Sequence, residues 1–577
     1  MQVLNFLSGY PPINRDIDKL ANAIFHLKEF YDNRLGPIDV PITPGELFPQ
    51  QKVVGRFLSS HTTYKGLLVV HETGTGKTCA AFAAAEANKH RKKIVFLTPN
   101  APLYKAQKEE LIKRCFPFEY RAKRGMLRPR LSGYTFKTHQ EFASEVSKVP
   151  EEQQIQNYSD TVFIVDEVQK IRNLSVRDAK KRAIKELKKR GIFADNEEYE
   201  KKLEIEQKKF EDKTYSHLHS LFHRVKRSKV ILLTATPMVD KASEIIDVLN
   251  LILPTDEQLP RRRSLNSEKL VEAIQGRVSY MRSPLGSASR FIELFVGDFT
   301  EEEREKVLAL VAPLKVVACK MKDEQSKFYL KALDKDLMGS PPEIVGETER
   351  VRIGKGALLT ETGKASLCVP LSEADSKKLS DRSIVFSTLL SKLRRDQGKS
   401  FVYISVVKGG LDELVKSLST AGWVNVSKKP DISGEKCFVV ITGETTNRKQ
   451  ILERFNRPSN AEGAEVRFLI GSRAIGIGVT LKDVENVHIL TPEWNYSGME
   501  QILGRSVRAG SHQVIESLRG EKIVVKNYLY VAIPKTNDEL SLIVNIDGNE
   551  ETCFDSLDLK KYITSIQKDK KILQVRR

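Results

Sequence analysis

The residues with the clearest chemistry lie in the segment HETGTGKT, positions 71–78, between the apolar run GLLVV and an alanine-rich run. Gly74 and Gly76 let the backbone approach a phosphate closely, so that main-chain N–H groups can donate to it. Lys77 brings a positive charge to the β- and γ-phosphate oxygens, and the Thr78 hydroxyl can ligate Mg²⁺. The segment therefore predicts a phosphate-binding loop in which Lys77 acts in catalysis. The expected nucleotide-binding residues of this loop are His71, Glu72, Thr73, Gly74, Thr75, Gly76, Lys77 and Thr78.

Two adjacent carboxylates, Asp166 and Glu167, end the apolar run TVFIV about ninety residues after the loop. Mg²⁺ prefers oxygen ligands and keeps most of its waters, so Asp166 can hold it together with Thr78. Glu167 can then orient or deprotonate the attacking water. A carboxylate pair at a strand end is often only a solvated cap. Its place in the same alternating pattern as the loop favours the catalytic interpretation.

Another apolar run, KVILL, leads into Thr234, Ala235 and Thr236. These small hydroxyl residues could hydrogen-bond the turn at Asp166 and Glu167 and so couple the nucleotide state to the position of a second domain. Thr236 could instead be a helix N-cap. The sequence favours coupling and leaves both interpretations open.

The second half of the chain holds a glycine-rich turn that ends at Gly478, followed by the run NYSGMEQILGRSVR. Arg505 and Arg508 are three positions apart, and we predict that they stand on one face of a helix. Guanidinium groups that enter from a second domain stabilise the charge developing on a transferring γ-phosphate, so both are candidate catalytic residues. Arginines at this spacing alone are usually surface ion pairs; the loop and the carboxylates favour catalysis. Gly478 is added to the expected nucleotide-binding residues.

Short apolar strands alternate with helical stretches around all these residues. Such alternation predicts parallel sheets covered by helices on both faces. The predicted fold class is α/β, with two parallel-sheet lobes in tandem, a helical bridging region and a charged helical insertion at residues 176–212 of the first lobe. The predicted segments are a lead-in at 1–45, an ATP-binding lobe at 46–255, the bridging region at 256–385, a second lobe at 386–535 and a basic C-terminal tail at 536–577.

The composition indicates a polyanionic partner. The 577 residues exceed what one hydrophobic core holds, and the net charge of +19 favours nucleic acid, bound through its phosphates with little sequence preference. No apolar run approaches the roughly 18 residues of a membrane span, and the N-terminus shows no secretion signal, so we expect a cytoplasmic protein without a membrane partner. The six cysteines form no CxxC pair, which favours reduced thiols and argues against a zinc site or a disulfide framework.

The ordered segments LFPQQ, HETGTGKT, IVFLTP, DEVQ, TATPM, GSRAIGIGVTL and QILGRSVR resemble the motifs of superfamily 2 helicases. The run EWNYSGMEQILGRSVR is similar to the chromatin-remodelling (Snf2-like) branch. The segments DEVQKIRN, TATPMVDKASEI, GRVSYMRS and GRSVRAGSH further resemble the ATPases of large cytoplasmic DNA viruses, namely poxvirus nucleoside triphosphate phosphohydrolase I and the small subunit of the poxvirus early transcription factor. The chain departs from these patterns at His71, Gln169 and Ile477, and none of these departures removes a phosphate or metal ligand.

The resemblance implies RecA-like lobes, ATP and Mg²⁺ as cofactors, and Gln51 as the residue that reads adenine. It also implies DNA-stimulated ATP hydrolysis in viral transcription, in the cytoplasm of an infected cell or in the virion. Three functions stay open: a motor that moves along DNA, with or without unwinding it; the ATPase subunit of a promoter-binding initiation factor, partnered by RNA polymerase or a second factor subunit; and an RNA helicase. We favour the motor that moves along DNA.

Overall fold

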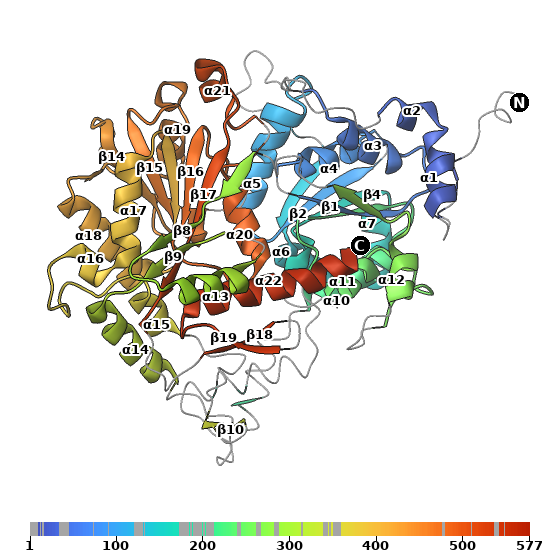
Figure 1. Cartoon of the computed structure of the whole chain (residues 1–577). Helices are drawn as coiled ribbons and strands as arrows, with labels where there is room; N and C mark the ends of the chain where they lie inside the picture. The colour runs from blue at the N-terminus through green and yellow to red at the C-terminus, as the bar shows by residue number, and fades with distance from the viewer. Residues whose placement is uncertain are drawn as a thin grey trace, which may run out of the picture. The chain divides into compact units, whose positions relative to one another are not determined.

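Two parallel sheets organise the chain, one in each of the units formed by residues 1–283 and 284–577 (Figure 1). The computed structural model describes residues 10–33, 45–120, 131–171, 213–238, 244–260, 267–281, 288–337, 359–535 and 542–576, with short gaps at 12, 14–16, 73, 91, 132, 313–314, 476–478, 509 and 547–548, and a few residues between these ranges. Among the described helices, none combines the length and the apolar character needed to cross a membrane.

The sheet of the first unit has the strand order β3-β2-β4-β5-β1-β6, and all neighbouring strands in it are parallel. β1, β4 and β5 are buried along their whole length. Strands that are buried on both faces have continuous apolar sequences, which explains why these three strands could be predicted from the sequence. The strands are β1 (Gly66–His71), β2 (Lys93–Thr98), β3 (Tyr134–Thr138), β4 (Thr161–Asp166), β5 (Lys229–Thr234) and β6 (Val278–Met281).

The alanine-rich helix α4 (Lys77–Glu86) is buried from Cys79 to Ala85. Its small side chains let α3 (Pro49–Phe57) approach closely: a Cβ on Gly55 would lie 3.1 Å from the Ala83 Cβ. This packing brings α3 to the helix that starts at the phosphate loop. The other helices of the unit are α1 (Ile17–Phe25), α2 (Lys28–Tyr31), α5 (Ala101–Glu110), η2 (Leu111–Cys115), α6 (His139–Ser147), α7 (Glu151–Tyr158), η3 (Val168–Lys170), α10 (Thr214–Arg224), α11 (Glu244–Asn250) and α12 (Ser267–Ile274).

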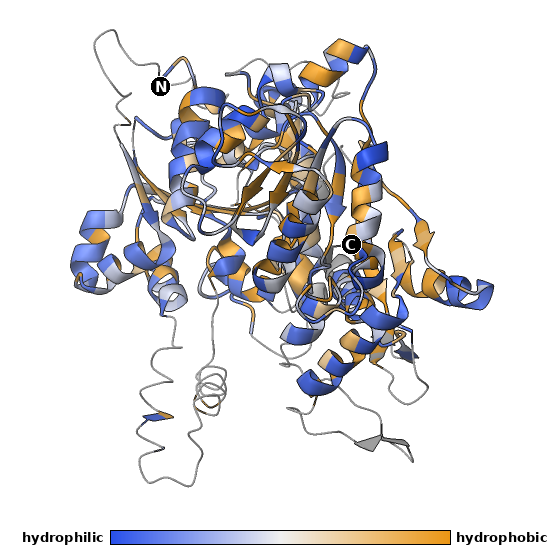
Figure 2. Ribbon diagram, turned by 90° about the vertical axis from the view of Figure 1, so that its left-hand side faces the viewer, coloured by the Kyte–Doolittle hydropathy of each residue, from blue (hydrophilic) through white to orange (hydrophobic). Residues whose placement is uncertain are grey.

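The sheet of the second unit has the order β13-β14-β15-β12-β16-β17-β9-β8, and β7 also pairs with β17. Its pairings are parallel too, and Figure 2 shows the sheet strands coloured as predominantly hydrophobic. The strands are β7 (Ser289–Phe291), β8 (Leu294–Val296), β9 (Val317–Lys320), β12 (Lys399–Tyr403), β13 (Val424–Asn425), β14 (Gly434–Ile441), β15 (Val466–Gly471), β16 (Val484–Ile489) and β17 (Val525–Ile533). Two antiparallel hairpins lie apart from it, β10 (Ile344–Val345) with β11 (Thr348–Glu349), and β18 (Ile543–Ile546) with β19 (Asn549–Thr552).

Helices of the second unit connect these strands. They are α13 (Glu301–Val311), α14 (Asp323–Leu337), α15 (Thr360–Ala365), α16 (Leu379–Arg382), α17 (Ile384–Arg395), η5 (Val407–Leu411), α18 (Asp412–Thr420), α19 (Arg448–Phe455), η6 (Pro458–Asn460), η7 (Arg473–Ile475), α20 (Tyr496–Leu503), α21 (Gln513–Arg519) and α22 (Leu557–Arg576).

Residues 256–385, predicted as one bridging region, are divided between the two units. β6 adds to the edge of the first sheet beside β1. In the second sheet, β7 and β9 pair with β17, and β8 pairs with β9. These strands are short and of mixed polarity, and β6 pairs with a strand about 200 residues earlier in the chain. The pattern of apolar residues within such a short segment does not predict which distant strand it pairs with.

The segment predicted as a C-terminal tail contains α22, on which Leu557, Tyr562 and Ile563 are buried in the second core. Many lysines stand between the apolar residues of this helix, so the basic composition was more apparent in the sequence than the spacing of the apolar residues. The charged insertion at 176–212 lies largely outside the described residues. Of its described residues, Leu187, Tyr199 and Leu203 form a small apolar cluster.

The expectation that all cysteines are reduced is corrected by the structure. Cys79 on α4 and Cys115 at the end of η2 form a disulfide. Their separation of 36 residues carries no recognisable signal, because the pairing depends on the packing of η2 against α4. The free cysteines among the described residues, Cys319, Cys368, Cys437 and Cys553, are buried.

Candidate active site

The phosphate loop joins β1 to α4 through two glycines in the left-handed region. The φ angle is +90° at Gly74 and +78° at Gly76, values that glycine adopts without the steric cost a side chain brings. Thr75 stabilises the turn, since its Oγ1 donates to the Glu72 carbonyl at 2.7 Å. The turn therefore has the backbone shape that a close approach to phosphate needs.

Lys77 and Thr78 occupy the first turn of α4, which begins at Lys77. The backbone N–H groups of a first helical turn have no partner within the helix, and with the helix dipole they attract anions. Both side chains are half-buried, so they remain accessible beside this anion site. Thr73, also expected to hold phosphate, lies outside the described residues.

Gln51 braces the loop from α3. Its Nε2 donates to the Gly76 carbonyl at 2.9 Å, and its Oε1 accepts from the Phe48 N–H at 2.9 Å. Gln50 beside it donates to the Thr75 carbonyl at 3.2 Å. A Cβ on Gly76 would lie only 2.2 Å from Gln51 Nε2, so the position requires glycine. Support of the loop by Gln51 is a role that the sequence did not indicate beside the expected contact with adenine.

His71 lies at the end of β1, and its Nε2 is 2.9 Å from Ser279 Oγ on β6. Burial, and secondarily the positive charge of Lys77, lowers the pKa of His71 to about 4. The imidazole is therefore neutral at physiological pH. Its contact with Ser279 joins it to the neighbouring strand β6.

The carboxylate of Asp166 is buried at the end of β4 and is held by two donors. Gln107 Nε2 donates to Oδ2 at 2.8 Å, and the Glu167 N–H donates to Oδ1 at 3.0 Å. Burial, followed by the negative charge of Glu167, raises the pKa of Asp166 to about 7, while the charge of Lys77 acts in the opposite direction. A divalent cation would favour the ionised form. The two buried carboxylates offer the oxygen ligands that hydrated Mg²⁺ prefers.

Glu167 adopts a left-handed backbone conformation, with φ of 54° and ψ of 46°. This conformation is uncommon for a residue with a side chain and occurs preferentially at functional sites. Its buried carboxylate accepts a hydrogen bond from Gln169 Nε2. Gln169 thus positions the group that we expect to act on water. His139, on α6, adds a contact of 3.0 Å from its Nε2 to the Asp166 carbonyl.

The sheet brings these groups to one edge. β1, β5 and β4 are adjacent and parallel, with Val70 paired to Thr234 and Asp166 paired to Leu233. The phosphate loop, the two threonines and the carboxylates therefore follow the carboxyl ends of three neighbouring strands, where ligands of α/β proteins bind.

Thr234, the last residue of β5, and Thr236 make no hydrogen bond to the carboxylate turn among the described residues. Thr234 Oγ1 accepts a hydrogen bond from the Thr236 N–H at 2.9 Å. Thr236 Oγ1 is buried and has no hydrogen-bond partner within the described residues. The helix-capping alternative for Thr236 is wrong, because Pro237 and Met238 after it are not helical and α11 begins only at Glu244.

In the second unit, the two arginines follow α20 and do not lie on it, which corrects the predicted helical placement. The helix ends at Leu503, because Gly504 forms its C-cap. Arg505 Nε donates to the Gln501 carbonyl at 3.4 Å, and Arg508 Nε donates to the Gly504 carbonyl at 2.6 Å. Both side chains thus reach back to carbonyls that the end of the helix leaves without helical partners.

Arg505 and Arg508 nevertheless remain close to each other. Burial, followed by the positive charge of Arg508, lowers the pKa of Arg505 to about 10. Arg508 Nη1 also donates to Thr480 Oγ1 at 2.8 Å, which fixes its guanidinium group. Two adjacent guanidinium groups, one of them buried, would be stabilised by an anion such as a phosphate. Gly478 lies outside the described residues.

A further basic residue beside the glycine-rich turn was missed by the sequence analysis. Arg473 donates to both carboxylate oxygens of Glu493, at 3.2 and 2.5 Å. Glu493 also accepts from the Tyr403 hydroxyl at 2.5 Å. These three residues follow or end β15, β16 and β12, so only the sheet order joins them.

Two conserved-domain models match the chain. The model described as type III restriction enzyme, res subunit, matches residues 46–239, and the model described as helicase conserved C-terminal domain matches residues 383–510. The first range contains the loop and the carboxylates, and the second contains both arginines. These two domain matches, in this order, are the pair that superfamily 2 helicases carry, and the chain is similar to that class of protein.

Its relatives include viral proteins named as helicases. One from Invertebrate iridescent virus 3 is 28% identical over 99% of this chain and 56% of its own length. One from Acanthamoeba polyphaga mimivirus, named as an ATP-dependent RNA helicase, is 24% identical over 84% of this chain and 82% of its own length. The chain spans about half the length of the iridescent virus relative and of a similar one from Frog virus 3.

Transcription proteins of DNA viruses also match, as the resemblance indicated. The early transcription factor 70 kDa subunit of Melanoplus sanguinipes entomopoxvirus is 26% identical over 26% of this chain and 25% of its own length. The termination factor NPH-I homolog of African swine fever virus is 21% identical over 56% of this chain and 53% of its own length. A solved structure of Mycobacterium smegmatis helicase Lhr, bound to ssDNA and AMP-PNP, covers 85% of this chain and 46% of its own chain, with 13% identity and a TM-score of 0.41.

Proposed function

We propose that this chain is an ATP hydrolase that uses ATP to move along DNA and that serves viral transcription. The observation that carries the proposal is the juxtaposition, at one sheet edge, of a glycine loop with Lys77 and Thr78 and of the buried pair Asp166 and Glu167. The charge of +19 supports a polyanionic track.

Each group has a defined chemical task in this proposal. Lys77 and the first N–H groups of α4 bind the phosphates, and Thr78 and Asp166 would hold Mg²⁺, which supplies charge neutralisation on the phosphate oxygens. Glu167, oriented by Gln169, accepts a proton from the attacking water. The Gln51 Oε1 and Nε2 atoms already contact the backbone, and we propose that the same amide also reads adenine.

The arginines of the second lobe complete the proposed site. Arg505 and Arg508 would stabilise charge on the γ-phosphate during transfer, and Gly478 would approach the nucleotide. Binding of ATP would then favour closure of the two lobes and hydrolysis would favour opening, so that repeated cycles shift the lobes along the strand. Translocation of the Snf2-like kind is the form that we propose.

Two alternatives have support from the relatives. The mimivirus relative is named as an RNA helicase, which favours RNA as the track. The entomopoxvirus relative is a transcription factor subunit, which favours an ATPase that works with a second subunit or with RNA polymerase at promoters. In either case we propose action in the infected cytoplasm or in the virion.

An ATPase assay with single-stranded DNA, duplex DNA and RNA tests the proposal. We expect stimulation by DNA above that by RNA. The Lys77→Ala variant should fold normally and lower turnover to near background, because loss of a charge aimed at the transferring group costs about 3 kcal/mol or more. Stimulation by RNA alone would support the RNA helicase, and activity only with an added partner subunit would support the transcription factor. A folded Lys77→Ala variant with normal turnover would refute this active site.

A further inference from the structure

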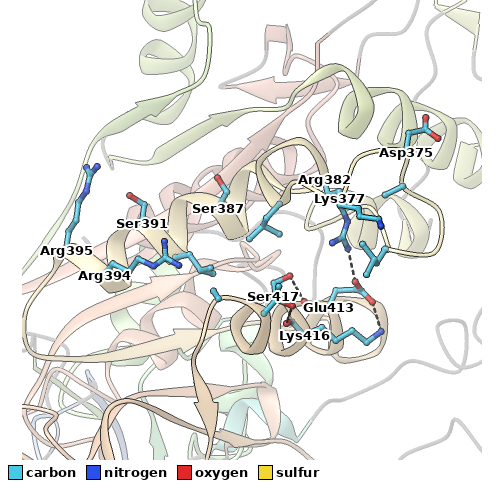
Figure 3. Close-up of a pocket in the computed structure, with 16 residues that line it drawn as sticks. Asp375, Lys377, Arg382, Ser387, Ser391, Arg394, Arg395, Glu413, Lys416 and Ser417 are labelled. Atoms are coloured by element: carbon cyan, nitrogen blue, oxygen red, sulfur yellow. Dashed lines mark hydrogen bonds and ion pairs between the residues drawn. The ribbon is translucent and has the colours of Figure 1, made fainter.

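A cavity of about 880 Å³ lies entirely within the second unit, between α17, α18 and the segment 371–379. Figure 3 shows α17 and α18 as its two walls, with Arg394 extending along the space between them. None of the residues assigned to the ATP site lines it. The cavity therefore requires an explanation separate from nucleotide chemistry.

The walls of this cavity are preformed by a buried ion pair. Arg382 Nη2 lies 3.0 Å from Glu413 Oε2, and both side chains are less than a tenth exposed. Arg382 also donates to the Val369 carbonyl from Nε and Nη2, at 3.1 and 3.0 Å. These contacts fix the segment beside α16 against α18. A preformed cavity binds its ligand with less loss of conformational entropy.

The rim of the cavity is positively charged. Five basic and two acidic side chains line it. Glu413 forms ion pairs with both Arg382 and Lys416, so these three side chains together carry a net charge of about +1. Lys377 and Arg394 are exposed and form no ion pair within the described residues. Uncompensated charge around a hollow attracts an acidic ligand.

The lining of the cavity combines apolar side chains with the hydroxyl groups of Ser387, Ser391, Ser417 and Thr420. Leu379, Leu390 and Ala421 contribute to the lining, and Leu371 at the rim is 54% exposed. Aromatic side chains, on which the bases of a single-stranded nucleic acid stack, are absent from the cavity lining. Apolar side chains set between two helices with charges at the rim are typical of grooves that bind an amphipathic helix.

The basic end of α17 lies at the edge of the sheet opposite to Arg473. α17 ends at Arg395, just before β12 begins at Lys399, so its basic end lies at the amino edge of the parallel sheet. Arg473 follows the carboxyl end of β15. A strand of this length separates the two edges by about 15 Å.

We infer that this cavity is a docking site for an acidic amphipathic helix of a partner protein. Leucine-like side chains of the helix enter between α17 and α18, and its carboxylates meet Lys377 and Arg394. The inference does not rest on the proposed ATPase activity, because the cavity residues and the ATP residues do not overlap.

Binding of a designed probe to the full chain tests the inference. The probe is a fluorescein-labelled helical peptide of about 16 residues, with leucine at positions i, i+3, i+4 and i+7 and glutamate elsewhere, followed by fluorescence anisotropy. We expect saturable binding, and no comparable binding by the same peptide with lysine in place of glutamate. Absence of saturable binding by the acidic probe would overturn the inference.

Matched variants locate the binding. Lys377→Glu combined with Arg394→Glu should weaken the probe at least tenfold, whereas Lys428→Glu combined with Lys449→Glu, an equal charge change at exposed positions elsewhere in the unit, should not. Leu371→Ser should weaken it, and Leu518→Ser, at a residue 64% exposed on α21, should not. ATP turnover, where present, should be unchanged in all four proteins.

Equal weakening by the paired variants and their controls would overturn the inference, because it would reveal attraction to net charge alone. A 20-nucleotide single-stranded DNA is then added as a competitor. If it displaces the probe, and if the Lys377→Glu plus Arg394→Glu protein also loses its affinity for this DNA, the cavity binds nucleic acid and the inference is overturned. Persistence of probe binding in the presence of that DNA would support a protein partner.

Discussion

Replacement of Gly76 by alanine tests whether the glycine loop is shaped by its contact with Gln51. The new Cβ would lie 2.2 Å from Gln51 Nε2, well inside van der Waals contact, so Gln51 must move. Movement breaks its 2.9 Å hydrogen bond to the Gly76 carbonyl, a loss of about 1 kcal/mol. The φ of +78° costs a residue with a side chain about 1–2 kcal/mol more. We expect the loop and the first turn of α4 to be destabilised by about 2–3 kcal/mol.

A double-mutant cycle separates these contributions. Gln51→Ala removes both the clash and the hydrogen bond, so the double variant Gln51→Ala with Gly76→Ala adds mainly the φ cost. The summed effects of the single changes should exceed the effect of the double variant by about 1 kcal/mol. Amide hydrogen exchange of α4, measured without nucleotide, gives the opening free energy without any contribution from adenine contacts.

Gly422→Ala is the matched control, because its φ is +86° and a Cβ there meets nothing within 4 Å. Its cost, measured by exchange at the end of α18, should reflect the backbone conformation alone. A cost at Gly76 no larger than the cost at Gly422, or strictly additive effects of the Gln51 and Gly76 changes, would refute the bracing role of Gln51.

Three further predictions concern the second lobe and the partner. Arg508→Ala should lower kcat about a thousandfold in single-turnover assays, with little change in ATP affinity. Arg508→Lys should restore hydrolysis only weakly, because the lysine ammonium lacks the planar guanidinium fork. Near-normal hydrolysis by Arg508→Ala would show that Arg508 is not part of the site. Burial lowers the pKa of His488 to about 3, so its contribution to the stability of the second unit should be complete above pH 6.5 and be lost at about 1.4 kcal/mol per pH unit between pH 6.5 and about 3. Urea unfolding followed by tryptophan fluorescence reports on this unit, which holds both Trp423 and Trp494, and His488→Gln should flatten the slope; an unchanged slope would contradict the assignment. DNA affinity should vary little among unrelated duplexes and fall with salt, each phosphate contact adding about 0.9 to the slope of log affinity against log salt, whereas a shallow slope with one preferred sequence would favour promoter binding.

The elements that sequence reasoning predicted best are those whose signal is local. The strands that end at His71, Asp166 and Thr234 are buried on both faces, so each appears as an unbroken apolar run. β6 and β9 have only four residues each and depend on partners far away in the chain, so they were absorbed into a bridging region.

The candidate site shows the same division. Two glycines followed by Lys77 identify a phosphate loop because that chemistry requires adjacent residues. Gln107 reaches Asp166 from 59 residues away, and nothing in its local sequence marks it. The helical placement of Arg505 failed because Gly504 ends α20 first. Contacts that depend on tertiary packing could therefore not be predicted from the local sequence and were found only in the structure.

The closure of each sheet within its own unit has a consequence for how this chain can be assembled. Among the described residues, every strand pairing lies on one side of residues 282–287, with β6 ending at Met281 and β7 beginning at Ser289. A break in the polypeptide there would interrupt no described strand ladder. The halves could therefore be made from two genes, and either could be exchanged for the matching half of a relative as an intact cassette. Such chimaeras would assign track preference and partner choice to one half or the other.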